Sequence, residues 1–291
     1  MGTSGTFGGS KSGLVPSWVD DPPSTPAGAP GSASPAGGDG GGDGGDGGAE
    51  PDTQAPAVAY PPLRPPPAGS GLGAARGNLT RGARTSDSRA IRRGSGQYVS
   101  ASGGGRGAAR RMPSSRAAAG GIAGLARNFA TQGPAEALRP FNLEGLAGAP
   151  AVDVFVALTD ALCPPGGTID EAIARDAMLE TIAALAAEGV GNFDEMTPED
   201  LQEFFIGVVS RSIEGKILNE VGTNSIRVSP DLAAVERAQH MLHDFVDGCV
   251  RDRFAASGSS LADVSGQQID DFVSELYGAA FDLMQTLGEA S

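Results

Sequence analysis

The amino-acid sequence predicts an all-α protein in which a helical bundle of five to seven helices follows a long disordered Gly/Pro-rich tail and an Arg-rich segment. Residues 1–72 contain 18 Gly and 13 Pro, which is typical of low-complexity chain without a packed core. From about residue 114 onward, apolar residues recur three and four positions apart, as they do on the buried face of a helix. The sequence contains no alternating apolar stretch of strand length and no internal repeat.

Charge divides the chain at similar places. Residues 1–72 hold 2 basic and 7 acidic side chains, residues 73–140 hold 12 and 2, and residues 141–291 hold 7 and 26. These three parts therefore carry net charges of −5, +10 and −19, which together make the formal −14. A basic middle beside an acidic C-terminal half indicates an interaction between opposite charges, either within the chain or with a partner.

The first part, residues 1–72, is expected to be a disordered tail because its composition buries too little apolar surface to offset the entropy of ordering. An apolar island at residues 14–19 contains the only Trp of the chain. An aromatic anchor in such a tail favours a docking segment for a partner, and a chance apolar patch is the alternative. The docking residues predicted in this island are Leu14, Val15, Pro16 and Trp18.

The second part, residues 73–113, is an Arg-rich basic segment with Tyr98 as its single aromatic residue. Binding of nucleic acid through phosphates is one interpretation, but the segment has no zinc-finger spacing, no aromatic interleaving and no sustained helical face. We favour the alternative, in which its guanidinium groups neutralise the acidic C-terminal half or a partner. The candidate residues of this segment are Arg84, Arg89, Arg92, Arg93, Arg110 and Arg111.

The third part, residues 114–291, is expected to be the α-helical domain. Ser114 begins an Ala-rich helix that ends near Gly133. Pro150 begins a second helix, which the Pro- and Gly-rich run at 163–167 ends. The joints between these helices are therefore marked by residues that cannot continue a helix.

The next two helices have stronger start signals. Thr168 and Glu171 form a capping box for a helix that ends at Gly189. Thr197 and Pro198 give the following helix a preferred N-cap and a Pro at its first position. Because the middle of this following helix is apolar nearly all round, we expect it to lie at the centre of the bundle.

Two further helices complete the domain. A Ser-Pro-Asp sequence at 229–231 begins a long helix that extends to about Ala256. The last helix begins near Ser265 or Gln268 and continues to about Leu287. A helical region of about 150 residues is large enough to bury a single core, so this domain should fold independently of the tail.

One row of polar residues contains side chains that could be interpreted as metal ligands. His240 and His243 are the only histidines of the chain, and they lie in a row with Glu236 and Asp247. The row lies off the apolar stripe of its helix and its spacing differs from that of carboxylate-bridged metal bundles, so we interpret it as a solvated face. No metal or other cofactor is predicted.

The remaining residue types do not suggest an enzyme. Cys163 and Cys249 are the only thiols, and we expect both to be reduced core residues. The sequence has no phosphate-binding Gly-rich loop after a strand and no nucleophile elbow. The first twenty residues lack a secretory signal, and no stretch is apolar enough to span a bilayer, so a cytoplasmic location is expected.

Several segments of the sequence together resemble the QatB family. The segments are MGTS at 1–4, LVPSW at 14–18, SDSRAIRRG at 86–94, GGGRGAARRM at 103–112, FNLEGLAG at 141–148, GGTIDEAIARDA at 166–177 and SIEGKILNEVG at 212–222. This family supplies the small, non-enzymatic component of the four-gene Qat anti-phage system of bacteria. Its implied partners are an ATPase, an enzyme resembling 7-cyano-7-deazaguanine synthase, and a nuclease resembling the TatD type.

The resemblance gives the N-terminus a role. Enzymes of the synthase type activate a deazaguanine carboxylate with ATP and let an amine attack it. Once Met1 is removed, Gly2 offers an unhindered α-amino group, whose ordinary pKa of about 8 leaves it partly nucleophilic at cell pH. Thr3 and Ser4 are small neighbours that we count among the partner-binding residues.

Taken together, the residues and the resemblance predict a non-enzymatic subunit of an anti-phage defence system. It is expected to bind partner proteins and to offer Gly2 as a substrate for deazaguanine conjugation by the synthase-like partner. The alternative is an adaptor that contacts nucleic acid through the Arg-rich segment.

Overall fold

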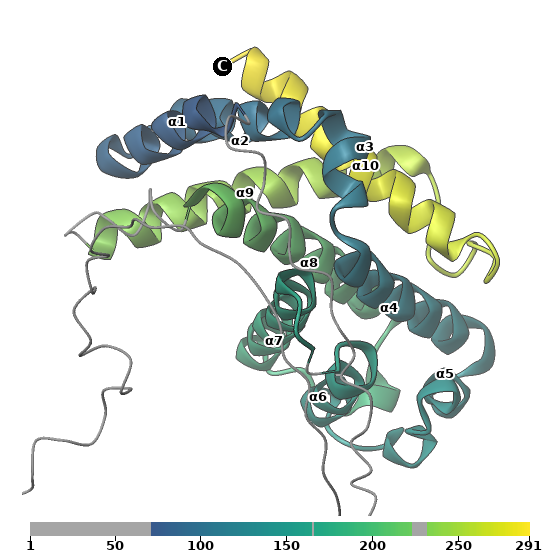
Figure 1. Cartoon of the computed structure of the whole chain (residues 1–291). Helices are drawn as coiled ribbons and strands as arrows, with labels where there is room; N and C mark the ends of the chain where they lie inside the picture. Colours follow the sequence, from purple (N-terminus) through teal and green to yellow (C-terminus); the bar gives the residue numbers. More distant parts are fainter. Residues whose placement is uncertain (1–70, 165, 223–231) are drawn as a thin grey trace, which may run out of the picture. The chain divides into compact units, whose positions relative to one another are not determined.

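The computed structural model describes residues 71–164, 166–222 and 232–291. Within these residues the chain forms ten α-helices and no strand beyond one isolated bridge between Pro150 and Asn192, which confirms the all-α prediction (Figure 1). The helices are α1 Leu72–Thr85, α2 Ser88–Ala101, α3 Gly104–Arg110, α4 Pro113–Gln132, α5 Pro134–Leu138, α6 Ala151–Leu162, α7 Ile169–Glu188, α8 Pro198–Ile217, α9 Leu232–Ser257 and α10 Ile269–Glu289.

Helices α4 and α6 to α10 follow the sequence signals closely, whereas the short α5 was not predicted. In the described part of 113–291 there are seven α-helices, within the five to seven expected. The predicted capping box forms, since Thr168 accepts from the backbone of Glu171. Thr197 is the predicted N-cap of α8, and it accepts from the backbone of Asp200. The predicted start of α9 at 229–231 lies outside the described residues.

The Arg-rich segment differs from the expectation, because it forms α1, α2 and α3. The predicted helical domain began at Ser114, and the helices begin at Leu72. The segment was not predicted to be helical, because its glycines weaken a helix in isolation. Here the missing side chains permit close packing: a Cβ on Gly96 would lie 3.0 Å from the Cα of Gly288 in α10.

These first helices pack on the C-terminal helix. Helix α2 contacts α1, α9 and α10, and α3 contacts α10, as Figure 1 shows for the dark-blue and yellow helices. The backbone N–H of Gly105 donates to Asp282 Oδ1 of α10 at 2.9 Å. All described helices belong to one compact unit, in which the first helices of the described chain pack against the last.

Helix α8 lies at the centre of the bundle, as predicted. It contacts α4, α7 and α9, and its residues 204–210 are all buried. Phe204 stacks on Phe155 of α6 with ring centroids 3.9 Å apart, and Phe205 packs against Phe254 and Phe272. Cys163 and Cys249 are buried free thiols, as expected.

Candidate functional site

The N-terminal residues predicted to act lie outside the described part of the chain. These residues are Gly2, Thr3, Ser4, Leu14, Val15, Pro16 and Trp18. Their roles in modification and docking therefore stay predictions. Among the described helices, none combines the length and the apolar character needed to cross a membrane.

The predicted basic residues lie on α1, α2, α3 and the turn after α3. Within the described chain, the guanidinium groups of Arg84, Arg89, Arg93 and Arg110 form no ion pair and no hydrogen bond. Three of these four residues are exposed, and Arg93 is half-buried. Arg92 lies over the ring of Phe245 in α9, with 5.9 Å between guanidinium carbon and ring centroid. Most of the positive charge of these arginines therefore lies at the surface of the described chain.

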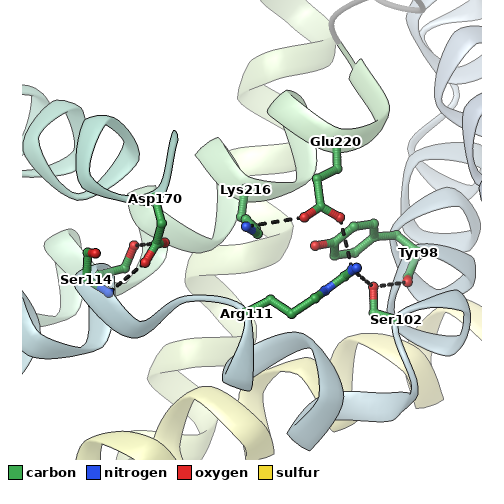
Figure 2. Close-up of polar contacts among 8 residues, drawn as sticks. Tyr98, Ser102, Arg111, Ser114, Asp170, Lys216 and Glu220 are labelled. Atoms are coloured by element: carbon green, nitrogen blue, oxygen red, sulfur yellow. Dashed lines mark hydrogen bonds and ion pairs between the residues drawn. The ribbon is translucent and has the colours of Figure 1, made fainter. Parts of the chain in front are cut away.

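Arg111 behaves differently, because it points into a polar group that we call the Glu220 cluster: Tyr98, Ser102, Arg111, Lys216 and Glu220 (Figure 2). Arg111 Nη2 lies 2.9 Å from Glu220 Oε2, and Lys216 Nζ lies 3.2 Å from Glu220 Oε1. Arg111 also donates to Ser102 Oγ at 2.7 Å. One carboxylate therefore holds two cations from distant parts of the chain.

The cluster is built from buried and half-buried side chains. Lys216 is only 8% exposed, so its ammonium group depends on the Glu220 carboxylate for compensation. Tyr98 is fully buried beside the cluster, and burial, followed by the charge of Glu220, raises the pKa of its hydroxyl. A π-helical turn, Leu218–Gly222, follows α8 and presents Glu220, whose backbone carbonyl also accepts from Arg76 of α1 at 3.3 Å.

A second polar contact joins α4 to α7. Asp170 Oδ2 accepts from the backbone N–H of Ser114 at 2.6 Å, and its Oδ1 accepts from Ser115 Oγ at 3.0 Å (Figure 2). The carboxylate thereby satisfies one of the free N–H groups at the start of α4 and meets the positive end of its dipole.

Three of the segments that resemble the QatB family thus supply these contacts. Arg111 comes from 103–112, Asp170 from 166–177, and Lys216 and Glu220 from 212–222. The sequence did not single out Lys216 or Glu220. Their only signal was membership in a segment of family resemblance, since Arg111 lies 109 positions before Glu220 in the sequence.

A cavity of about 520 Å³ opens between α7, α8 and α9, and we call it the α7–α9 cavity. Among its lining residues are Asp176, Glu180, Arg211, Glu214, Glu236, His240 and His243. Glu236 and His240 are exposed at the rim of this cavity, as expected for a solvated face, whereas His243 is half-buried. Asp247 is also half-buried. It accepts a hydrogen bond from Ser210 Oγ at 3.0 Å and pairs with Arg251 at 2.6 Å.

One ion pair forms inside the cavity. His243 Nδ1 lies 2.9 Å from Glu214 Oε2, and this hydrogen bond raises the pKa of His243 against the opposing effect of burial. Burial, followed by the charge of Glu214, raises the pKa of the nearby Glu180. Within the described residues, no group of His, Cys, Asp and Glu side chains is arranged to hold a metal ion.

The comparison with protein families agrees with the resemblance seen in the sequence. No curated protein and no solved structure matches the chain. The family described as Qat anti-phage system associated protein QatB matches residues 103–284, from the turn before α3 to the last turns of α10. The match covers more than half of the chain and includes most of the Glu220 cluster, Asp170 and the α7–α9 cavity. The chain therefore belongs to the QatB family and is a component of the Qat anti-phage system.

Proposed function

We propose that this chain is the non-catalytic, partner-binding subunit of its Qat system, and that its N-terminal Gly2 receives a deazaguanine acyl group from the synthase-like partner. The observation that supports the proposal is the family match over residues 103–284, joined to the Gly2-Thr3-Ser4 sequence at the N-terminus. We expect the complex to act in the cytoplasm.

The proposed chemistry needs only a primary amine on this chain. The partner would activate the carboxylate of a deazaguanine with ATP, and the nitrogen of Gly2 would attack the activated carbon. The ATP-derived group leaves, the amine loses a proton, and an amide bond forms. Glycine suits this step because it has no side chain to hinder the approach of its α-amino group.

The docking segment is placed to assist this reaction. About ten residues separate Gly2 from Leu14, and an extended chain of that length spans about 33 Å. Trp18 could therefore bind at the rim of the partner's pocket while Gly2 enters it. A rigid aromatic side chain gives large contact area at low entropic cost, which is why Trp is frequent at such anchors.

The experiment is co-expression of the full chain with the synthase-like partner, followed by intact-mass measurement. The wild-type chain should gain one deazaguanine acyl group at its N-terminus. Gly2→Pro, which leaves a hindered secondary amine, should abolish the gain, whereas Gly2→Ala keeps a primary amine and is the matched control. Trp18→Ala should lower the modified fraction, and Trp18→Phe should retain more of it. A chain that is never modified, or a gain that survives Gly2→Pro, would refute the proposal.

The second candidate function is contact with nucleic acid. It is favoured by four guanidinium groups that have no partner among the described residues, those of Arg84, Arg89, Arg93 and Arg110. Such binding should show little sequence preference and weaken steeply with salt, by a slope of about −0.9 per neutralised phosphate. We expect only weak binding, because residues 141–291 carry a net charge of −19. Tight, salt-resistant binding that is lost when these four arginines are changed to Gln would favour nucleic-acid contact over the partner-binding function proposed above.

A further inference from the structure

The Glu220 cluster, which the proposed function does not use, holds more hydrogen-bond donors than acceptors. Its acceptors are the Glu220 carboxylate and the Ser102 hydroxyl, and both accept from the same atom, Arg111 Nη2. The Nε and Nη1 atoms of Arg111 form no hydrogen bond with the described residues. A guanidinium group can donate from all three nitrogens, so part of its capacity is unused.

Lys216 also has unused donors, and it is nearly buried. Its ammonium group carries several N–H donors. Among the described residues, its one ion-pair partner is Glu220, with 3.2 Å between Nζ and Oε1. Because the residue is only 8% exposed, water compensates its charge poorly. Lys216 would therefore gain from a further acceptor.

The hydroxyl of Tyr98 independently points to the same need. Tyr98 is fully buried, and Figure 2 shows its ring pointing into the cluster between Glu220 and Arg111. Ser102 and Arg111 lie nearby, but the hydroxyl forms no hydrogen bond within the described chain. Buried hydroxyl groups are almost always hydrogen-bonded, so an unpaired one indicates a partner that the chain itself does not supply.

The charge of the cluster determines which partner fits. Arg111, Lys216 and Arg76 are three cations around a single carboxylate, since Arg76 donates to the backbone carbonyl of Glu220. The Arg111 side chain is 41% exposed, whereas that of Lys216 is 10% exposed. The cluster is therefore open to solvent at Arg111 and closed at Lys216. A small anion can reach it from the Arg111 side.

A phosphate group matches this set of donors. Its oxygens accept several hydrogen bonds at once, and guanidinium and ammonium groups are its usual partners in proteins. Glu220 lies on the π-helical turn Leu218–Gly222, a backbone form that is rare and frequent at functional sites. The Glu220 carboxylate already binds both cations, as an external anion would.

We propose that the Glu220 cluster binds a small phosphate-bearing anion, and that the Glu220 carboxylate occupies the place of this anion in the free chain. On binding, the phosphate oxygens accept from Arg111, Lys216 and Tyr98, and the Glu220 side chain turns toward solvent. The site then satisfies the Tyr98 hydroxyl and the unused donors of both cations.

Isothermal titration calorimetry of the full chain at constant ionic strength tests the proposal. Inorganic phosphate is the first probe, and saturable binding is expected. ATP is the second probe, because it carries the same chemistry on a nucleotide. Tighter binding of ATP than of phosphate identifies a nucleotide as the ligand, and equal or weaker binding identifies the free anion.

Two variants and a matched control locate the site. Tyr98→Phe removes only an unpaired hydroxyl, so the fold should be retained while affinity for phosphate falls about tenfold. Arg111→Gln should weaken binding by at least about tenfold. Arg110→Gln removes the same charge from the adjacent exposed residue and should leave the affinity nearly unchanged.

Glu220→Gln should act in the opposite direction. It replaces the competing carboxylate by a neutral group of the same shape, so phosphate should bind about tenfold more tightly. A cluster that serves only to hold helices together would not produce this gain. Far-UV circular dichroism shows whether each variant is folded, and Tyr98→Phe decides the matter if the charge variants are not.

Three outcomes would overturn the proposal: no saturable binding of either probe, unchanged affinity in Tyr98→Phe, or equal losses in Arg110→Gln and Arg111→Gln. The last result would indicate general attraction of anions to the basic helices. The Gly2 experiment is independent of this one, because none of these substitutions alters the N-terminus and either result can hold without the other.

Discussion

At the residue scale, Glu220 joins segments that lie far apart in the sequence. Its carboxylate binds Arg111 and Lys216, and its carbonyl accepts from Arg76. The contact with Arg111 spans 109 positions. Such a pairing cannot be predicted from local pattern, because nothing in the spacing of either segment specifies the other.

Removal of the Glu220 carboxylate should destabilise the fold. Glu220→Ala leaves the buried Lys216 without its counter-charge and should lower the free energy of unfolding by about 3 kcal/mol. Lys216→Met in the same background should restore part of the loss, because it removes the unpaired charge. Urea denaturation followed by circular dichroism measures both effects.

The control for this prediction is Glu203→Ala. Glu203 pairs with Arg251 at the surface, where both side chains are about half exposed, so its loss should change stability by less than about 1 kcal/mol. If Glu220→Ala is as mild as Glu203→Ala, the Glu220 cluster does not hold the helices together.

His243 should make stability depend on pH. Its hydrogen bond to Glu214 raises its pKa in the folded chain above the ordinary value of about 6.5. The stabilisation is therefore complete below the unfolded pKa and is lost as the pH rises through the folded pKa. Denaturation midpoints measured across this range should fall with rising pH in wild type, and His243→Gln should flatten that part of the profile. His240→Gln serves as the control, and a similar flattening there would contradict the assignment to His243.

At the element scale, the helices that were predicted are those with explicit end signals. Helices α7 and α8 begin with capping boxes that the sequence displays, and α6 and α10 follow clear apolar periodicity. Helices α1 to α3 were not predicted because their glycines count against a helix in isolation. Their stability comes from packing on α9 and α10, and that contribution is visible only in the folded unit.

Two glycine substitutions in these helices should act in opposite directions. Gly96→Ala places a Cβ 3.0 Å from the backbone of Gly288 and should destabilise the α2–α10 contact by about 1–3 kcal/mol. Gly77→Ala in α1 meets nothing within 4 Å and should stabilise its helix by about 0.5–1 kcal/mol. Thermal unfolding of the two variants provides the comparison, and stabilisation by Gly96→Ala would show that α2 and α10 do not approach closely.

At the scale of the whole molecule, the folded unit includes the Arg-rich segment. The sequence placed the start of the helical domain near Ser114, but α1 begins at Leu72 and contacts α2 and α9. The positive helices and the acidic half are therefore parts of one folded body. Among the predicted basic residues, only Arg111 forms an ion pair with the described residues of that acidic half, so ion pairs within the described chain involve a small share of the basic charge.

Limited proteolysis should locate this boundary. Backbone held in packed helices resists cleavage, so the smallest stable fragment should begin close to residue 72 and extend to the last turns of α10. N-terminal sequencing and mass measurement of the fragments identify its ends. A resistant core that begins near residue 114 would mean that α1 to α3 do not belong to the folded unit.

The central claim concerns Gly2, and the most direct test is the mass of the N-terminal peptide from the assembled, phage-resisting complex. The chain is purified from cells in which the complete system protects against phage, and its N-terminal peptide is fragmented to locate any added group. The account predicts a deazaguanine acyl group on the α-nitrogen of Gly2, and loss of that group together with protection in Gly2→Pro. A free, unmodified Gly2 in the protective complex would contradict it.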